Sequence, residues 1–288
     1  MTTPKDPNPE RKPRDDEIDV FGMTHPGKVR PNNQDHFLIC SLSRAVTVHA
    51  TSLPEPGLIA GNGERVAFLS MVADGVGGGP SGEEASRIAV ENIAKYITHS
   101  LQAYHTADPT DHAAFRAALE AAAWRGHEEL KKLAEDDPDR RGMATTLTLW
   151  LGIWPQSYLL QVGDSRCYLL KGTTLTQVSR DQTMAQELFD QGVLTTTEAH
   201  RTPLANVLSS SIGGSQTAPV VTPILQEWGN VGMLCSDGLY KHVSDDQIKQ
   251  RLTTMTSAKQ VCEALLQDAL DGGGTDNVTI VVGRTVRK

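Results

Sequence analysis

The chain has 288 residues, of which 39% are hydrophobic, and a formal net charge of −8 at pH 7. This length and apolar content fit one large, sheet-rich domain with a sizeable core. The acidic balance argues against a nucleic-acid partner, because nucleic-acid binders usually carry a basic surface. No apolar run reaches the length of a membrane span, so we expect no membrane partner.

The first 17 residues are rich in charges and prolines and contain no apolar stretch. They predict a disordered tail over residues 1–17, not a secretory signal, followed by a single domain over residues 18–288. None of the cysteines has C-x-x-C spacing, so we expect buried free thiols in a cytoplasmic protein. The cysteines are Cys40, Cys167, Cys235 and Cys262.

Strand patterns in the first third of the chain cover residues 18–23, 37–41 and 66–73. The Pro- and Gly-rich residues 43–66 predict a hairpin excursion or a loop between the last two strands. Ser81 and Glu84 have the spacing of a capping box, which predicts that a helix starts at this point. A second helix is predicted after Asp111, because apolar residues follow it at helical spacing.

The second half of the chain predicts a strand-rich meander over residues 145–153, 158–162, 166–171 and 175–178. A helix is predicted over residues 182–191, and a polar loop or flap over residues 195–216. A short buried strand at residues 232–236 precedes helices after Ser244 and Ser257, and a last strand covers residues 278–283. Because strands and helices come in groups, the order favours α+β layering over βαβ alternation.

One pattern recurs three times: an aspartate beside Gly or Asn lies at the edge of an apolar strand. It occurs at Asp74-Gly75, Asp237-Gly238 and Asp276-Asn277. Carboxylates that converge at one end of a sheet repel one another unless a cation neutralises them. Oxygen ligands of this kind suit Mg²⁺ or Mn²⁺ better than Zn²⁺. Each Asp-Gly pair taken alone is equally explained as a turn.

Six short segments carry a joint pattern that is more specific than any single dipeptide. They are R-x-x-N-Q-D (residues 30–35), V-A-D-G-V-G-G (72–78), G-M-A-T-T (142–146), G-D-S-R (163–166), S-D-G-L (236–239) and G-T-D-N-V-T (274–279). Together they resemble the PP2C family of metal-dependent protein serine/threonine phosphatases, over about residues 19–284. The resemblance implies an α+β fold, a four-layer α-β-β-α sandwich with two central antiparallel sheets.

The resemblance implies a site for two Mn²⁺ or Mg²⁺ ions. Asp74 would bridge the two ions, and Gly75 would offer its backbone carbonyl to one of them. Asp237 and Asp276 would ligate the second ion. A water molecule shared by the ions would then attack the phosphorus of a phosphate ester.

The resemblance also assigns roles around these ligands. Arg30 would bind the substrate phosphate, which suits the fork of its guanidinium group. Asp35 would hold metal-bound waters, and Gln34 would hydrogen-bond to such waters in place of the acid that the family usually has there. Asn277 would lie close to the metals without binding them.

Three departures from the family pattern concern other parts of the site. Val76 stands where many animal members have a histidine that is thought to act as general acid. Arg141 and Gly142 stand where relatives often place an aspartate, with Asp139 slightly upstream, which argues against a full third metal site. The flap motif is degraded over residues 202–207.

Four other residues are interpreted as structural. Asp164 and Arg166 in G-D-S-R are expected to organise a hairpin turn. His36 and His242 adjoin candidate ligands, but they are expected to be surface or packing residues.

The predicted activity is hydrolysis of phosphoserine and phosphothreonine in proteins that a cognate kinase phosphorylates, by a monomer. Two alternatives stay open: a non-catalytic phosphoprotein-binding module on the same fold, and a phosphoesterase that acts on small molecules. The degraded flap favours the binding module, whereas the retained aspartates and Arg30 favour an enzyme.

Overall fold

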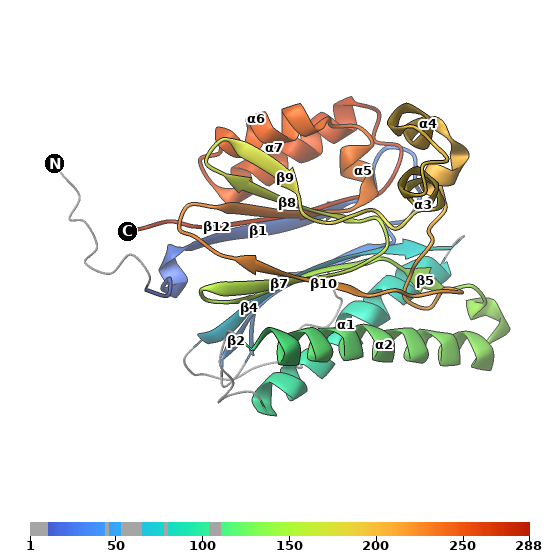
Figure 1. The fold of residues 1–288 in the computed structure, drawn as a ribbon, viewed down its shortest axis with the longest axis horizontal. Helices are drawn as coiled ribbons and strands as arrows, with labels where there is room; N and C mark the ends of the chain where they lie inside the picture. The colour runs from blue at the N-terminus through green and yellow to red at the C-terminus, as the bar shows by residue number, and fades with distance from the viewer. Residues whose placement is uncertain (1–10, 44–45, 53–64, 78–79, 104–110) are drawn as a thin grey trace.

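Two β-sheets stacked between two layers of helices form the body of the molecule, as seen in the computed structural model (Figure 1). The structure describes residues 11–43, 46–52, 65–77, 80–103 and 111–288. The predicted α+β sandwich is therefore confirmed.

The first sheet has the strand order β1-β12-β11-β8-β9 and is antiparallel throughout. Its strands are β1 (Ile18–His25), β8 (Arg166–Lys171), β9 (Thr174–Gln177), β11 (Val231–Cys235) and β12 (Val278–Thr285). Helices α6 (Asp245–Thr253) and α7 (Ala258–Asp271) cover its outer face. Ser244 caps α6 in a capping box with Gln247, as its sequence predicts.

The second sheet has the order β10-β7-β6-β4-β2-β3, and β5 pairs with β4. Its strands are β2 (Asp35–Ser43), β3 (Val46–Thr51), β4 (Arg65–Val76), β5 (Ala144–Thr145), β6 (Leu147–Ile153), β7 (Gln156–Val162) and β10 (Val220–Leu225). Helices α1 (Pro80–Ala103) and α2 (His112–Asp136) cover its outer face. The β2–β3 pair confirms a hairpin after residue 43, and residues 53–64 lie outside the described residues.

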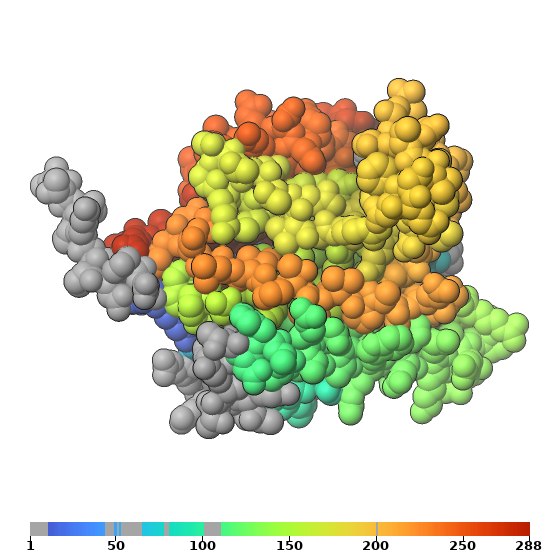
Figure 2. Space-filling view, in the orientation of Figure 1, coloured from blue at the N-terminus to red at the C-terminus, as the bar shows by residue number. Residues whose placement is uncertain are grey.

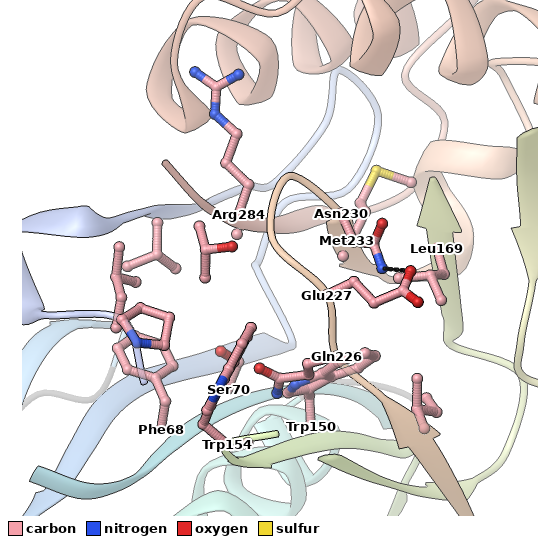
Figure 3. Close-up of a pocket in the computed structure, with 18 of the residues that line it drawn as sticks. Phe68, Ser70, Trp150, Trp154, Leu169, Gln226, Glu227, Asn230, Met233 and Arg284 are labelled. Carbon is pink, nitrogen blue, oxygen red and sulfur yellow. Dashed lines mark hydrogen bonds between the residues drawn. The ribbon is translucent and has the colours of Figure 1, made fainter. Parts of the chain in front are cut away.

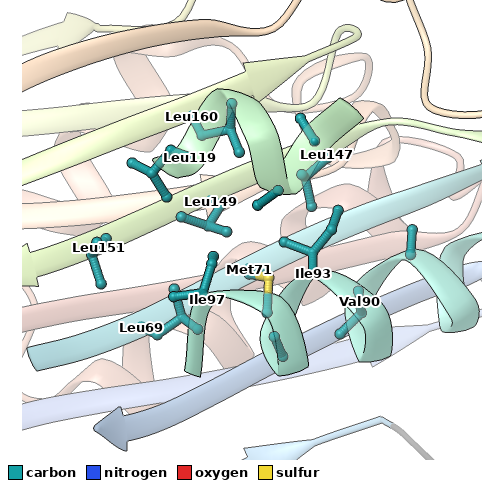
Figure 4. Close-up of a cluster of buried hydrophobic side chains, with 14 of the residues drawn as sticks. Leu69, Met71, Val90, Ile93, Ile97, Leu119, Leu147, Leu149, Leu151 and Leu160 are labelled. Atoms are coloured by element: carbon teal, nitrogen blue, oxygen red, sulfur yellow. The ribbon is translucent and has the colours of Figure 1, made fainter. Parts of the chain in front are cut away.

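Three apolar clusters hold these layers together. In the cluster drawn in Figure 4, Ile93 of α1 and Leu119 of α2 pack on Met71 of β4 and Leu149 of β6. A second cluster fills the space between the other sheet and helices α6 and α7. A third lies between the two sheets, where Val72 of β4 packs with residues of the facing sheet. Burying such apolar surface is the main force that fixes the order of the layers.

Shorter helices lie at one end of the sandwich, beside α5 (Asp237–Tyr240). They are α3 (Met184–Asp190), α4 (Thr196–Arg201) and η4 (Pro203–Asn206), whereas the short turn η3 (Pro138–Arg140) follows α2. Figure 2 shows the α3–α4 segment, in gold, as a lobe that projects at this end. The predicted loop over residues 195–216 therefore contains two short helices, of which α4 starts with a capping box at Thr195.

Two local expectations are wrong. Residues 11–17, assigned to a disordered tail, are ordered: Asp15–Glu17 form η1, and Arg11 holds the buried carboxylate of Glu17 with two hydrogen bonds of 2.6 and 2.7 Å. Ser81 does not cap α1, because the helix already includes Pro80. Glu84 instead receives two hydrogen bonds from Arg140, which join η3 to α1.

Two other expectations, the cap of α2 and the state of the cysteines, are confirmed. Asp111 caps α2 by accepting a hydrogen bond from the backbone of Ala114. All four cysteines are free and buried. Among the described residues, no helix is both long and apolar enough to cross a membrane.

Candidate active site

Asp35 and Asp74 lie directly opposite each other on the antiparallel strands β2 and β4. Asp74 was expected where its strand ends, but β4 continues through Gly75 to Val76 and pairs with β5. The backbone around Asp74 is held on both sides, because its N–H donates to Thr146 Oγ1 and its carbonyl accepts from the Thr146 N–H. The carboxylate therefore projects from rigid strand backbone, which suits a precisely shaped site.

Gly75 has a packing role that the sequence reasoning missed. A Cβ at this position would lie 2.1 Å from the carbonyl oxygen of Gly82, in the first turns of α1. Any side chain here would push α1 away from β4. The backbone that approaches Gly75 closely is therefore that of Gly82 in α1.

Gly238 brings two of the predicted ligands together in a similar way. A Cβ at Gly238 would lie 2.0 Å from the carbonyl oxygen of Asn277. Because only glycine fits there, α5 packs closely on the segment that precedes β12. Asp237, the first residue of α5, and Asp276, just before β12, therefore reach the same end of the sheet.

An open pocket of about 570 Å³ lies where these segments meet. Its lining includes seven of the eight predicted site residues: Arg30, Gln34, Asp74, Gly75, Asp237, Asp276 and Asn277. The eighth, Asp35, is buried beside it. The structure thus brings together residues from four distant parts of the chain.

Asp35 has one bonded and one unbonded carboxylate oxygen. Its Oδ2 accepts hydrogen bonds of 2.7 Å from both Ser236 and Thr279. Its Oδ1 is buried and has no hydrogen-bond partner among the described residues. Burial raises the pKa of Asp35 to about 7, despite those two hydrogen bonds.

Asp74 is surrounded by other carboxylates. Burial, followed by the negative charge of Asp35 and then that of Asp237, raises the pKa of Asp74 well above its usual value. The buried Oδ1 of Asp237, like that of Asp35, has no partner among the described residues. Such crowding is stable only if protons or cations neutralise part of the charge.

Two side-chain cations partly neutralise this cluster. Arg30 donates to Asp276 Oδ2 over 2.8 Å, and the pKa of Arg30 is raised by that bond. Lys241, one helical turn after Asp237, forms an ion pair with Asp237 Oδ2. Burial lowers the pKa of Lys241, but the charge and hydrogen bond of Asp237 outweigh this effect and raise it.

The carboxylate oxygens of the pocket are suitable ligands for divalent cations, although their present arrangement does not form a complete metal-binding site. No three His, Cys, Asp or Glu side chains in the described part of the chain stand together as a metal-binding group. The unbonded oxygens of Asp35 and Asp237 and the raised pKa of Asp74 are what a hard cation would satisfy. Arg30 and Lys241 would have to release their carboxylates for such an ion to bind.

Asn277 fixes the loop that carries Arg30. Its Nδ2 donates to the carbonyls of Pro26 and Asn32, and its Oδ1 accepts from the Gln34 N–H over 2.8 Å. The Gln34 side chain donates to the carbonyl of Gly77. Gln34 therefore ties the Arg30 loop to the segment after β4, and its contact with metal-bound waters stays a prediction.

Asp164 and Lys241 line the pocket, and the sequence analysis did not assign either of them to the site. Asp164 is buried, and burial together with the charge of Asp237 raises its pKa to about 7. The G-D-S-R motif was a usable signal, but it was interpreted only as a hairpin turn. Lys241 could have been found from its spacing, since a residue four positions after Asp237 faces the same side of a helix.

The other residues interpreted as structural are held by nearby partners. Arg166 forms hydrogen bonds with Asp181, the shortest of 2.7 Å, and stacks over the ring of Tyr240. His36 is hydrogen-bonded to Ser86, and His242 to Thr275. Arg166 thus links β8 to α5 and to the segment before α3, a larger role than organising one turn.

Asp139 and Arg141 lie on an exposed turn around η3. The backbone N–H of Asp139 donates to Asp137, and η3 is tied to α1 through Arg140. The expected weakness of a third metal site stays a prediction.

Comparison with known proteins identifies the family. The family model described as Protein phosphatase 2C matches residues 59–271 of this chain. The serine/threonine protein phosphatase PstP of Mycobacterium tuberculosis is 36% identical over 234 residues, which are 80% of this chain but 43% of PstP. The chain therefore spans less than half the length of that relative. This chain belongs to the protein phosphatase 2C family.

Solved structures agree with this assignment. The crystal structure of M. tuberculosis PstP/Ppp has a TM-score of 0.74 at 31% identity and covers 94% of this chain and 99% of that chain. The catalytic domain of PstP in complex with two manganese ions has a TM-score of 0.69 at 31% identity, with the same coverage. The two-sheet sandwich is thus the fold of known phosphatases.

Proposed function

We propose that this protein hydrolyses phosphoserine and phosphothreonine in proteins and depends on two Mn²⁺ or Mg²⁺ ions. The observation that carries the proposal is the pocket in which Asp74, Asp237 and Asp276 meet beside Arg30. Acidic residues alone would repel a phosphate ester, so a pocket of this kind needs cations to bind one. The manganese-bound PstP structure supports the same choice of metal.

Asp74, Gly75, Asp237 and Asp276 would hold the ions. When bound, the ions supply charge neutralisation and activation of a water molecule. Asp35 holds the start of β2 in place through Ser236 and Thr279, and its buried Oδ1 has no hydrogen-bond partner among the described residues.

Arg30 would bind the substrate phosphate. Its side chain is half exposed at the pocket and needs only to exchange the carboxylate of Asp276 for phosphate oxygens. Lys241 stands on the Asp237 side of the same pocket, where it adds a second positive charge for an incoming phosphate. Val76 has no ionisable group, so protonation of the leaving group falls to water or to another residue of the pocket.

We propose that residues 11–288 act as one domain and as a monomer in the cytoplasm. Its substrates would then be proteins phosphorylated by a cognate kinase.

Hydrolysis assays with and without metal test the proposal. The full chain should hydrolyse an aryl phosphate and a phosphothreonine peptide, lose both activities in EDTA, and regain them with Mn²⁺. Hydrolysis of the aryl phosphate without the peptide would favour a small-molecule phosphoesterase. Peptide binding without any hydrolysis would favour a binding module, and full activity after exhaustive chelation would refute metal dependence.

A further inference from the structure

A half-open cavity lies between the two sheets, at the opposite end of the sandwich from the carboxylate pocket. It has a volume of about 120 Å³ and a mostly apolar lining. In Figure 3 its side chains come from both sheets, with Phe68, Ser70 and Trp150 on one side and Leu169 on the other. The register of β1 with β12 fixes its position: Ile18 and Thr285, which line the cavity, are paired at the strand ends farthest from Asp276.

The cavity exists because glycines replace side chains in the layer between the sheets. Successive residues of a strand alternate between its faces, so positions two apart share a face. Leu234 and Val281 fill the core between the sheets, but two residues further along these strands stand Gly232 and Gly283, which pair with each other. A Cβ at Gly232 would meet no heavy atom of another segment closer than 4.0 Å. The sequence therefore leaves open a volume that one further layer of side chains would fill.

The size and lining of the cavity define what it can hold. An enclosed apolar cavity of about 150 Å³ holds one benzene ring, and drug-sized ligands occupy about 300 Å³ or more, so this half-open cavity of about 120 Å³ has room for one ring at most. The walls include the aromatic residues Phe68 and Trp150, and aromatic rings pack favourably on one another. Gly152 also lines the cavity, and the side-chain nitrogens nearest to where its Cβ would stand are Gln226 Nε2 at 2.7 Å and the Trp150 indole nitrogen at 3.6 Å, so this wall carries N–H donors.

Polar side chains also line the cavity, where Asn230 donates to Glu227 over 3.4 Å. Apolar walls with a few fixed polar groups are typical of small-molecule sites.

We propose that this cavity is a binding site for a small planar molecule, a single aromatic ring that carries one hydrogen-bond acceptor, as in a phenol. The ring lies between the sheets in the space left by Gly232 and Gly283, and its oxygen accepts from the Trp150 indole.

Titration of phenol and benzene into the full chain, followed by ligand-observed NMR, tests this site. Wild type should bind both saturably, with phenol tighter. Gly232→Ala should weaken phenol binding at least threefold, and Gly232→Val should abolish it. Thr174→Val, on an exposed strand of the same sheet, is the matched control and should bind like wild type.

Circular dichroism and thermal unfolding establish that each variant is folded. Gly232→Ala keeps the test decisive if Gly232→Val does not fold, because the alanine methyl group has room. Absence of saturable phenol binding in wild type would overturn the proposal. Equal affinity in wild type and Gly232→Ala would overturn it too.

Discussion

Nη2 of Arg30 lies 2.8 Å from Oδ2 of Asp276, although the two residues are 246 positions apart in the chain. The ion pair holds the guanidinium group at the pocket before any phosphate arrives.

Arg30→Ala should lower kcat/KM about ten- to a hundredfold, because hydrogen bonds to charged groups contribute about 1.5–3 kcal/mol. Affinity for Mn²⁺ should not fall, since the change frees Asp276. Steady-state kinetics with calorimetric Mn²⁺ titration checks both, and Arg116→Ala on the exposed face of α2 is the control. Normal kcat/KM, or lost Mn²⁺ binding, would contradict the assigned role.

Asp237→Asn removes one negative charge from the carboxylate cluster and keeps the shape of the side chain. We expect turnover to fall by about a hundredfold or more, because charge neutralisation and water activation both depend on bound cations. The fold should stay intact by circular dichroism. Asp246→Asn makes the same change on exposed α6 and should behave like wild type. If Asp237→Asn binds two Mn²⁺ ions and turns over normally, Asp237 is not a ligand.

The contribution of buried carboxylates to the stability of the metal-free protein should decrease as pH rises from about 4 to about 7, and it is opposed by His36, whose pKa is lowered to about 4 by burial. The pKa of Asp35 is about 7 in the fold against a usual 3.8, so the folded state binds more protons than the unfolded state across this range. Asp164, with its pKa also raised to about 7, acts in the same direction. The stabilising protonation is complete below pH 4 and is lost as pH passes the folded pKa. Chemical denaturation in EDTA at several pH values measures this slope.

Asp35→Asn provides the control for that slope. The amide carries no charge, so the metal-free variant should be more stable than wild type at pH 7.5 and show a flatter pH dependence. An unchanged slope would mean that Asp35 does not carry the raised pKa.

Lys241 competes with metal ions for Asp237. Lys241→Met keeps a long side chain but removes the positive charge, so Mn²⁺ affinity should rise about three- to tenfold, in line with about 1 kcal/mol for two charges near 4 Å in water. Calorimetric titration measures the change, and Lys249→Met on the exposed face of α6 should leave it unaltered. An unchanged or weaker affinity would show that Lys241 does not compete with the metal.

Apolar periodicity predicted the order of strands and helices. The two-sheet sandwich and the ligand roles of the three aspartates were implied by the resemblance to the PP2C family, and those roles stay predictions. The sequence itself marked Asp74, Asp237 and Asp276 only through their Gly or Asn neighbours. It could not predict that β4 runs through Asp74, since that depends on pairing with β5, nearly seventy residues later. Composition likewise labelled residues 11–17 as a tail, whereas the carbonyl of Glu17 accepts a hydrogen bond from Val286 at the far end of the chain.

Asp164 illustrates a different limit. A short Gly-Asp-Ser sequence favours a turn, and here it connects β7 to β8. Only the packing of Tyr240, whose hydroxyl donates to the Asp164 carbonyl, shows that this turn faces the carboxylate pocket. Local propensity identifies such a turn but not what it faces.

Strand β12 lies between β1 and β11, so the first strand of the domain pairs with the last. During synthesis β1 can pair with β12 only after almost the whole chain has been made. Pairings between such distant segments close large loops, and they make folding slow and late. Asp276 lies two residues before β12, so the complete carboxylate pocket cannot assemble in a nascent chain that lacks this segment. Strands β2 and β4, which carry Asp35 and Asp74 opposite each other, are complete long before Asp276 is synthesised, so the last carboxylate of the pocket arrives only with the final strand.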